Sequence, residues 1–118
     1  MENGSTASKL RVFIGSTDKT GHQILYEWIV FKAKEAGLAG VTVIHGTMGF
    51  GASSVIHSYK FWDVTGKVPV VVEIVDEQDK VSAFFEDIRP VLESMNYGCM
   101  VTMEDVDVLM YKAGNVRN

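Results

Sequence analysis

Cysteine is almost absent from this chain of 118 residues, which contains only Cys99. A single cysteine excludes an internal disulfide and cannot by itself hold a zinc ion, and this usage fits a reducing, cytoplasmic compartment. Long apolar runs are absent too, since no segment approaches the roughly 20 apolar residues of a membrane span. Residues 1–8 (MENGSTAS) lack the apolar core of a secretory signal, so we expect no signal peptide and a disordered lead-in there.

Basic residues are few and scattered. The chain has 11 lysines and arginines against 15 aspartates and glutamates, which gives a formal net charge of −4. Because nucleic-acid-binding proteins neutralise phosphates with a concentrated Lys/Arg surface, this balance argues against a nucleic-acid partner. Catalytic motifs are missing as well: there is no nucleophile elbow, no Cys–His motif and no His-Glu zinc helix. We therefore expect no enzymatic activity and no catalytic residues.

The hydrophobic residues, 47% of the chain, follow two periodicities. Alternation of apolar and polar side chains predicts strands over residues 9–16, 40–46, 68–75 and 104–112, and the return strand of a long hairpin within 55–64. Spacings of three and four residues predict helices over residues 22–37 and 76–95. This β-α-β-β-α-β order predicts a ferredoxin-like α+β sandwich, with one antiparallel sheet and both helices on one face. The domain is expected to span residues 9–112, followed by a short tail, 113–118.

Individual residues refine the two predicted helices. We expect Gly37 to end the first helix. We expect Asp76 to cap the second helix, with Asp79 at the position that the acid of a capping box occupies. Pro90 lies inside the periodic pattern of the second helix, so a kink or a shortened turn is expected there.

Alternation also predicts which strand residues face the helices: Leu10, Val12, Ile14, Val70, Val72, Ile74, Val106, Val108 and Met110. The opposite face still holds large apolar groups, namely Phe13, Val71, Val75, Leu109 and Tyr111. A surface this apolar on a small sheet favours burial against other subunits over exposure to water.

A glycine-rich stretch, GTMGFGASSVIHS at residues 46–58, follows the second predicted strand. It is not a P-loop, because the Lys-Ser/Thr pair is missing, and not a dinucleotide fingerprint, because a strand follows it. Glycines let successive backbone N–H groups converge on an anion, and hydroxyl donors lie nearby. The candidate anion-binding residues are Gly49, Phe50, Gly51, Ala52, Ser53 and Ser54. The same composition also describes a flexible hairpin tip, so both interpretations stay open.

Two lysines at strand ends are further candidates. Lys19 follows the first predicted strand and Lys112 ends the last, and each offers a point charge to a phosphate. For Lys19 the alternative is an exposed lysine beside Asp18, which would cap the first helix.

The histidines suggest a metal site only weakly. His45 and His57 would approach each other across a paired hairpin, but Asp or Glu would have to complete a ligand set. Ordinary half-buried histidines are the simpler interpretation, and His22 is expected to be solvated or to cap the first helix loosely. We predict no metal site.

Four segments together resemble a known family: LRVFIGSTDKTGHQILYEWIV, GLAGVTVIHGTMGFG, VPVVVEIVDEQDKV and VTMEDVDVLMYK. They resemble the PII-like proteins, which are grouped as a domain of unknown function (family 190) beside the PII signalling proteins. The resemblance runs from about Lys9 to Lys112, nearly the whole chain, and is therefore more specific than any single glycine motif.

The resemblance implies a homotrimer whose sheets line the inside of the assembly. It implies that adenine nucleotide binds in clefts between subunits, at the base of a hairpin called the T-loop, and that this hairpin contacts a transporter, channel or enzyme. Gly49, Phe50 and Gly51 match the glycine-aromatic-glycine that begins the T-loop. Tyr97 and Gly98 fall at the second nucleotide loop, and Lys112 falls where a neighbour's basic residues approach phosphate.

The sequence also departs from true PII proteins. The hairpin of residues 52–64 is shorter than a full T-loop, and Tyr59 is a poor substitute for a modified tyrosine at its tip. MNYGCM lacks the glycine- and lysine-rich phosphate loop, and Met110 stands where an arginine is usual. With each missing charge-assisted contact costing roughly 1.5–3 kcal/mol, AMP or ADP is expected to bind better than ATP. The alternative function is a metal-binding trimer resembling the copper-tolerance CutA proteins, through His45 and His57.

Overall fold

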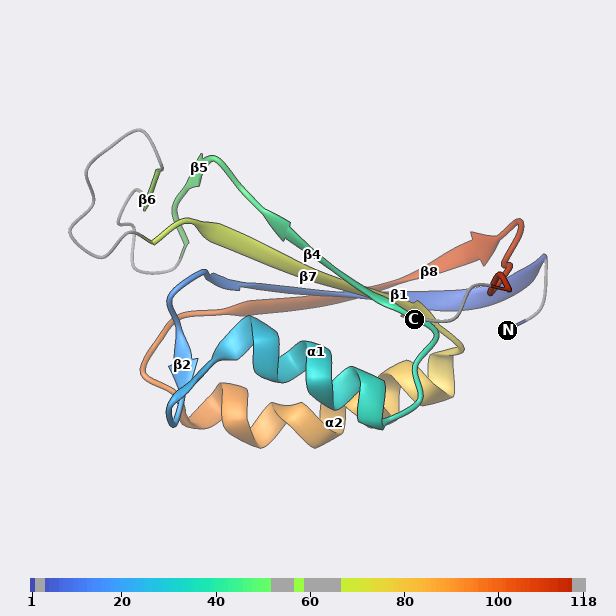
Figure 1. The fold of residues 1–118 in the computed structure, drawn as a ribbon, viewed down its shortest axis with the longest axis horizontal. Coiled ribbons are helices and arrows are strands. Elements are labelled where there is room, and N and C mark those ends of the chain that lie inside the picture. Colours follow the sequence, from blue (N-terminus) through green and yellow to red (C-terminus); the bar gives the residue numbers. More distant parts are fainter. Residues whose placement is uncertain (2–3, 52–56, 59–66, 116–118) are drawn as a thin grey trace.

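A computed structural model describes residues 1, 4–51, 57–58 and 67–115 (Figure 1). The long elements are β1 (Ser5–Gly15), α1 (Leu25–Glu35), β4 (Val41–His45), β7 (Pro69–Asp76), α2 (Gln78–Ser94) and β8 (Met100–Val108). Two-residue strands lie in the connections: β2 (Lys19–Thr20), β3 (Gln23–Ile24), β5 (Met48–Gly49) and β6 (His57–Ser58). The long elements follow the predicted β-α-β-β-α-β order.

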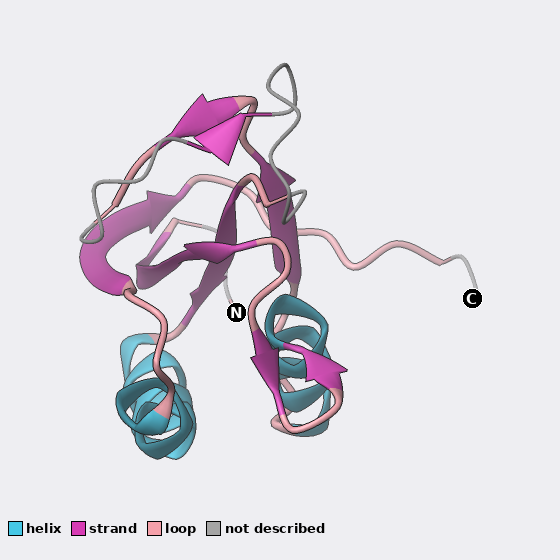
Figure 2. Cartoon of the chain, turned by 90° about the vertical axis from the view of Figure 1, so that its left-hand side faces the viewer, coloured by secondary structure: helices cyan, strands magenta, loops and turns pink. Residues whose placement is uncertain are grey.

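The four long strands form one antiparallel sheet in the order β4-β7-β1-β8. Both helices pack side by side against the same face of this sheet (Figures 1 and 2). The arrangement confirms the predicted ferredoxin-like α+β sandwich. Within the described residues, neither helix is long and apolar enough to cross a membrane.

The hydrophobic core lies between the sheet and the helices. The strands contribute the predicted alternating residues of β1 and β7, which are Leu10, Val12, Ile14, Val70, Val72 and Ile74. The helices contribute Leu25, Ile29, Ala33, Val81, Phe84, Ile88 and Leu92. Because full burial of a large apolar side chain stabilises a protein by about 1.5–3 kcal/mol, this cluster fixes the helices on the sheet.

β1 begins earlier than predicted. Residues 5–8, expected in a disordered lead-in, extend β1 and pair with residues 105–108 of β8. Ala7 and Ser8 are buried. The prediction was wrong for these residues because they show no alternation of apolar and polar side chains, whereas backbone pairing with a long neighbouring strand determines their conformation.

The first helix begins at Leu25, not near His22. His22 lies in the turn between β2 and β3, beside Gly21, whose φ of 60° is in the left-handed region. Because Lys19 and Thr20 pair with Ile24 and Gln23, the residues between Asp18 and Leu25 form a short hairpin and the helix begins only after it. The helix ends as predicted, with Gly37 at a φ of 75° just after it.

Asp76 does not cap the second helix, and the predicted capping box with Asp79 is absent. The N-cap is Glu77, which makes no side-chain cap hydrogen bond. Asp76 ends β7 and is buried, and its carboxylate accepts hydrogen bonds from the N–H of Glu77 at 2.7 Å and of Ala39 at 2.8 Å. It therefore joins the start of α2 to the loop between α1 and β4. Pro90 lies inside α2, which continues to Ser94.

The last strand ends at Val108, so Met110 and Lys112 lie beyond it. The predicted orientation of Val106 and Val108 was also wrong. In the register with β1, Val101 lies opposite the buried Val12, whereas Val106 lies opposite Ala7 at the other parity. The register places Val101 and Met103, opposite Val12 and Leu10, on the helix-covered face, so the apolar residues at even positions of β8 lie on the other face. The β1–β8 ribbon also extends past the helices (Figure 1).

The sheet face away from the helices carries a row of apolar side chains, one from each strand. Phe13 pairs with Val71 and with Met100, and Val71 also pairs with Ile44. Ile44 is 47% exposed and Met100 is 54% exposed. We name these four residues the apolar row. Val75 lies on the same face, as predicted, whereas Leu109 and Tyr111 follow the end of β8.

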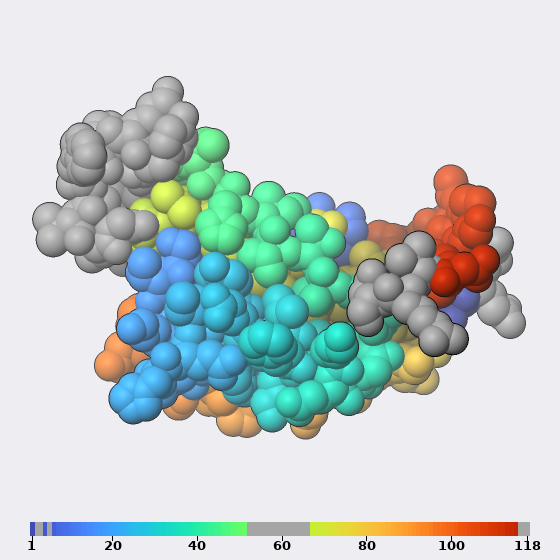
Figure 3. Space-filling model, in the orientation of Figure 1, coloured from blue at the N-terminus to red at the C-terminus, as the bar shows by residue number. Residues whose placement is uncertain are grey.

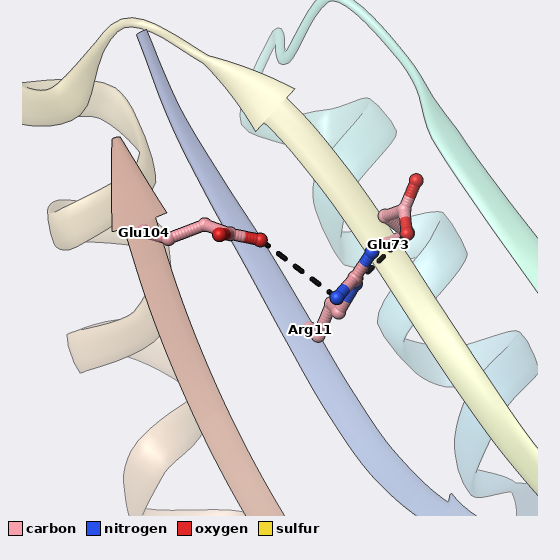
Figure 4. A network of polar contacts seen from close by, with 3 residues as sticks. All are labelled: Arg11, Glu73 and Glu104. Carbon is pink, nitrogen blue, oxygen red and sulfur yellow. Dashed lines mark hydrogen bonds and ion pairs between the residues drawn. The ribbon is translucent and has the colours of Figure 1, made fainter. Parts of the chain in front are cut away.

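A charged row lies next to the apolar row. Arg11, on the central strand β1, forms an ion pair with Glu73 on the neighbouring strand β7 and lies near Glu104 of β8 (Figure 4). The Arg11 Nε to Glu73 Oε2 distance is 3.0 Å, and the Arg11 Nη1 to Glu104 Oε1 distance is 3.7 Å. One arginine thus lies between two carboxylates in the middle of the uncovered face.

Candidate functional site

Three segments converge at one end of the sheet, where β1 ends and β7 begins. Figure 3 shows the start of β7 (yellow) packed between the residues after β1 (blue) and those around β5 (green). Two hydrogen bonds join the segments: Ser16 N–H donates to Val68 O at 2.9 Å, and Val68 N–H donates to Ser16 Oγ at 3.0 Å. The end of β1 is therefore tied to the residues that return from the central hairpin.

Asp18 and Lys67 form an ion pair at this junction, with 2.5 Å between Oδ1 and Nζ. The Asp18 side chain is 1% exposed, and its Oδ2 accepts a hydrogen bond from Gly15 N–H at 2.8 Å. A Cβ atom on Gly15 would overlap the side chain of Lys67. A side chain at position 15 would therefore require the end of Lys67 to move from where it crosses β1.

Lys67 also contacts the loop that precedes β8. Its Nζ lies 4.9 Å from the ring centroid of Tyr97, within the range of a cation–π interaction. Cys99 follows in the same loop and is exposed. Partial burial raises the pKa of the Cys99 thiol, and the negative charge of Asp18 raises this pKa further. The carboxylate, the ammonium, the phenol ring and the thiol thus form one cluster, which we call the junction cluster.

Glycines bring the outgoing arm of the hairpin close to β7. Gly46 N–H donates to Pro69 O at 2.7 Å. A Cβ on Gly49 would lie 3.0 Å from Pro69 Cγ, so this position also favours glycine. Phe50 follows with 68% of its surface exposed, and Gly51 is open, with nothing within 4 Å of the position of a Cβ. Backbone groups and an aromatic face are therefore available beside the junction cluster.

The structure brings together only part of the predicted site. The chain enters the hairpin at this end of the sheet through Gly49, Phe50 and Gly51. Tyr97 lies at the same end. Ala52, Ser53 and Ser54 lie outside the described residues, as do most of the predicted return strand and Tyr59. Gly98 and Lys19 are exposed, the latter on β2.

Lys112 lies away from the other predicted site residues of its own chain. β8 runs from Met100, opposite Phe13, to Val108, opposite Ser5, so its end lies at the far end of β1. The predicted contact between Lys112 and phosphate therefore requires a neighbouring subunit.

The sequence interpretation identifies only Tyr97 among the four residues of the junction cluster. It offers Asp18 as a helix cap and gives no role in the site to Lys67 or Cys99. Gly15 pairs with Pro69 in the antiparallel β1–β7 register, so the residues just outside this pair must meet. The register of two predicted strands was the signal that could have identified this contact.

The two histidines that suggested a metal site lie on different strands. His45 ends β4 opposite Val70, and its ring lies edge-on to Tyr26 with 5.3 Å between the centroids. His57 pairs through its backbone with Gly49. Among the described residues, no three His, Cys, Asp or Glu side chains form a group that could hold a metal ion.

A known protein family matches most of the chain. Residues 7–108 match the family DUF190, described as "Uncharacterized ACR, COG1993". The chain belongs to this family. A UPF0166 protein of Aquifex aeolicus is 33% identical over 100 residues, which cover 85% of this chain and 90% of that protein. The UPF0166 protein MJ1524 of Methanocaldococcus jannaschii is 24% identical over 88 residues, or 75% of this chain and 81% of that protein.

Solved structures show that this DUF190 chain has the fold of PII-like proteins. CPII of Thiomonas intermedia K12, a nitrogen regulatory PII-like protein bound to ADP, AMP and bicarbonate, aligns with a TM-score of 0.67. The alignment covers 90% of this chain and 91% of CPII at 16% identity. TTHA0516 of Thermus thermophilus, described as a PII-like signaling protein, aligns over 88% of this chain and 90% of its own, with a TM-score of 0.63 and 16% identity. The resemblance seen in the sequence is thereby confirmed.

Proposed function

We propose that this protein is a PII-like regulatory trimer that binds AMP or ADP between subunits, at the end of the sheet that holds the junction cluster. The observation that carries the proposal is the convergence of the glycine-rich hairpin arm, Lys67 and the Tyr97 loop in one place. It gains support from the shared fold with CPII, whose structure contains ADP and AMP. The proposed role is regulatory, without a catalytic step.

The chemistry of the convergent groups suits an adenine nucleotide. The ammonium of Lys67 and the backbone N–H groups near Gly49 and Gly51 suit a phosphate. Tyr97 and Phe50, which are 40% and 68% exposed, offer aromatic faces on which an adenine ring can stack. The modest positive charge here favours AMP or ADP over ATP.

The trimer is supported by the sheet face that carries no helix. The apolar row exposes Ile44 and Met100 in the single chain, and covering such side chains stabilises an assembly by about 25 cal/mol per Å². Closure of three such faces on one another would bring the far end of β8, with Lys112, toward the junction cluster of a neighbour. The proposed site therefore draws on two subunits.

The nucleotide signal is proposed to pass through the hairpin to a partner protein, which is a transporter, channel or enzyme in the cytoplasm. A ligand changes the hairpin only if it binds one arrangement more tightly than another. The hairpin arms begin at Gly46 and end at Lys67, so both ends lie at the proposed nucleotide site.

The experiment is a thermal melt with AMP, ADP and ATP, run on the natural protein and on Gly51→Val. No atom lies within 4 Å of the position of a Cβ at Gly51, and the backbone there is not left-handed. Valine should therefore leave the fold intact and obstruct only the space that the nucleotide would enter. We expect AMP or ADP to raise the melting temperature of the natural protein but not of Gly51→Val, while both stay trimeric. Identical melts with and without all three nucleotides would overturn the proposal.

A further inference from the structure

The junction cluster contains a positive and a negative charge that neutralise each other. Lys67 is the residue of the cluster that suits a phosphate, yet its Nζ lies 2.5 Å from Oδ1 of Asp18. The Lys67 side chain is 20% exposed and the Asp18 side chain only 1%. A phosphate that approaches the ammonium therefore also meets the field of a buried carboxylate directly behind it.

The carboxylate of Asp18 is fixed in place. Its Oδ2 accepts the N–H of Gly15 at 2.8 Å, and its backbone carbonyl accepts the N–H of Leu25 at 2.8 Å. Asp18 is thus held between the end of β1 and the start of α1 and cannot turn away when a ligand arrives. Since removal of the cation would leave a buried charge uncompensated, Lys67 is expected to stay with Asp18 in the bound state.

The negative charge of Asp18 is felt beyond Lys67. Next to partial burial, it is the second cause that raises the pKa of the Cys99 thiol in the neighbouring loop. The ion pair therefore does not present a simple cation to a ligand. It presents an ammonium whose attraction for anions is reduced, close to a residual negative field.

We propose that Asp18 sets the charge selectivity of this site, so that it takes nucleotides of low negative charge, AMP before ADP and ADP before ATP. The proposal rests on the nucleotide site proposed above and names a specificity-determining residue in it. Each further phosphate brings more negative charge near Asp18, whereas the Lys67 cation is already partly neutralised. The penalty therefore grows with the charge of the ligand.

Two substitutions are expected to move the selectivity in opposite directions. Asp18→Asn keeps an oxygen that can accept the Gly15 N–H but removes the negative charge, so the ratio of AMP to ATP affinity should fall by about tenfold, mainly through tighter ATP binding. Lys67→Gln removes the cation and leaves Asp18, so every phosphate ligand should bind more weakly and the ratio should rise. Adenosine should bind equally to all three proteins.

The measurement is isothermal titration calorimetry with AMP, ADP, ATP and adenosine on the natural trimer and both variants. Asp87→Asn is the matched control, because Asp87 is exposed on α2, in the helix layer and away from the sheet face that is proposed to meet other subunits. Opposite shifts of the AMP-to-ATP ratio, with the control unchanged, support the proposal. The double variant Asp18→Asn/Lys67→Gln, which leaves no unpaired charge in the cluster, is the second test: its AMP-to-ATP ratio should lie below that of Lys67→Gln alone, and an equal ratio would overturn the role of Asp18.

The failures of the two proposals can be told apart. If the natural protein binds AMP or ADP but the ratio stays the same in the variants, the role of Asp18 is wrong and the nucleotide site stands. If the natural protein binds no nucleotide, both proposals are wrong. A parallel change of all affinities, adenosine included, would assign the pair a purely structural role and would overturn this inference.

Discussion

Arg11 donates a hydrogen bond from Nε to Oε2 of Glu73 at 3.0 Å, across the two central strands and on the sheet face that no helix covers (Figure 4). The side chains of Arg11 and Glu73 are 39% and 26% exposed in the single chain. Because it lies next to the apolar row, this pair suits a surface that meets other copies of the chain in one fixed alignment.

Arg11→Met is expected to weaken the proposed trimer much more than the single chain. In the single chain the half-exposed pair contributes about 0.2–1 kcal/mol. Where copies cover the face, loss of the cation leaves buried carboxylates uncompensated, at a cost of about 3–5 kcal/mol per site. Analytical ultracentrifugation at micromolar concentration should therefore show dissociation while circular dichroism stays unchanged.

Arg89→Met is the control for this prediction. Arg89 lies near Glu86 and Glu93 on the surface of α2 at 3.8 and 3.6 Å, away from the uncovered sheet face. The Arg89→Met substitution should leave the assembly intact. Equal sedimentation of both variants as trimers would contradict the assigned role of Arg11.

Gly15→Ala is expected to disturb the junction cluster. The new methyl group would overlap the Lys67 side chain, so either the lysine or the end of β1 must move. Overpacking of this kind typically costs about 1–3 kcal/mol. We expect a lower urea midpoint and weaker AMP binding, whereas Gly40→Ala, with nothing within 4 Å of the new Cβ, should leave both unchanged. Unaltered AMP affinity in Gly15→Ala would separate the cluster from the ligand site.

Asp76→Asn should destabilise the fold without altering the proposed site. The buried carboxylate accepts two backbone N–H groups, and an amide offers only one oxygen to them. One buried donor is left unsatisfied, which costs about 1–3 kcal/mol. Urea denaturation measures the change, with Asp87→Asn as the control, because Asp87 is exposed on α2. A midpoint shift no larger than that of the control would show that the two hydrogen bonds contribute little.

Cys99 is expected to react slowly with iodoacetamide. Partial burial, and then the charge of Asp18, raise the pKa of its thiol, so less thiolate is present at a given alkaline pH than in the unfolded chain. The folded state keeps its proton to higher pH, so this group reduces stability as the pH rises above the ordinary thiol pKa. Mass spectrometry at pH 8 should show slower labelling in the folded than in the urea-unfolded protein.

Asp18→Asn should speed the labelling of folded Cys99, since it removes the second cause of the raised pKa. A control reaction of the unfolded variant should match that of the unfolded natural protein. Faster labelling of the natural folded protein than of its unfolded form would contradict the assigned environment of the thiol.

The fold was predictable because its central strands have a strong alternating pattern. Leu10 and Val72 lie where period-two spacing predicts, and Leu25 and Ile88 where helical spacing predicts. The errors fall at element ends, where spacing carries little information. The start of β1 at Ser5 depends on pairing with β8, a contact between residues about a hundred positions apart.

The candidate site was predicted less completely than the fold. The resemblance pointed to the glycines around Gly49 and to the Tyr97 loop, which lie at the same end of the sheet, and their role in binding stays a prediction. The resemblance did not identify Lys67 as a site residue. Lys67 belongs to the site because it forms an ion pair with Asp18, which joins the ends of two strands. Residue type alone does not identify such a contact, whereas the strand register that creates it can be derived only once both strands are paired.

Native mass spectrometry with an excess of AMP tests the central claim most directly. We expect an assembly of three 13.0-kDa chains that carries up to three AMP molecules. Added ADP should replace some of the bound AMP. Only single chains, or trimers that retain no adenine nucleotide under these conditions, would contradict it.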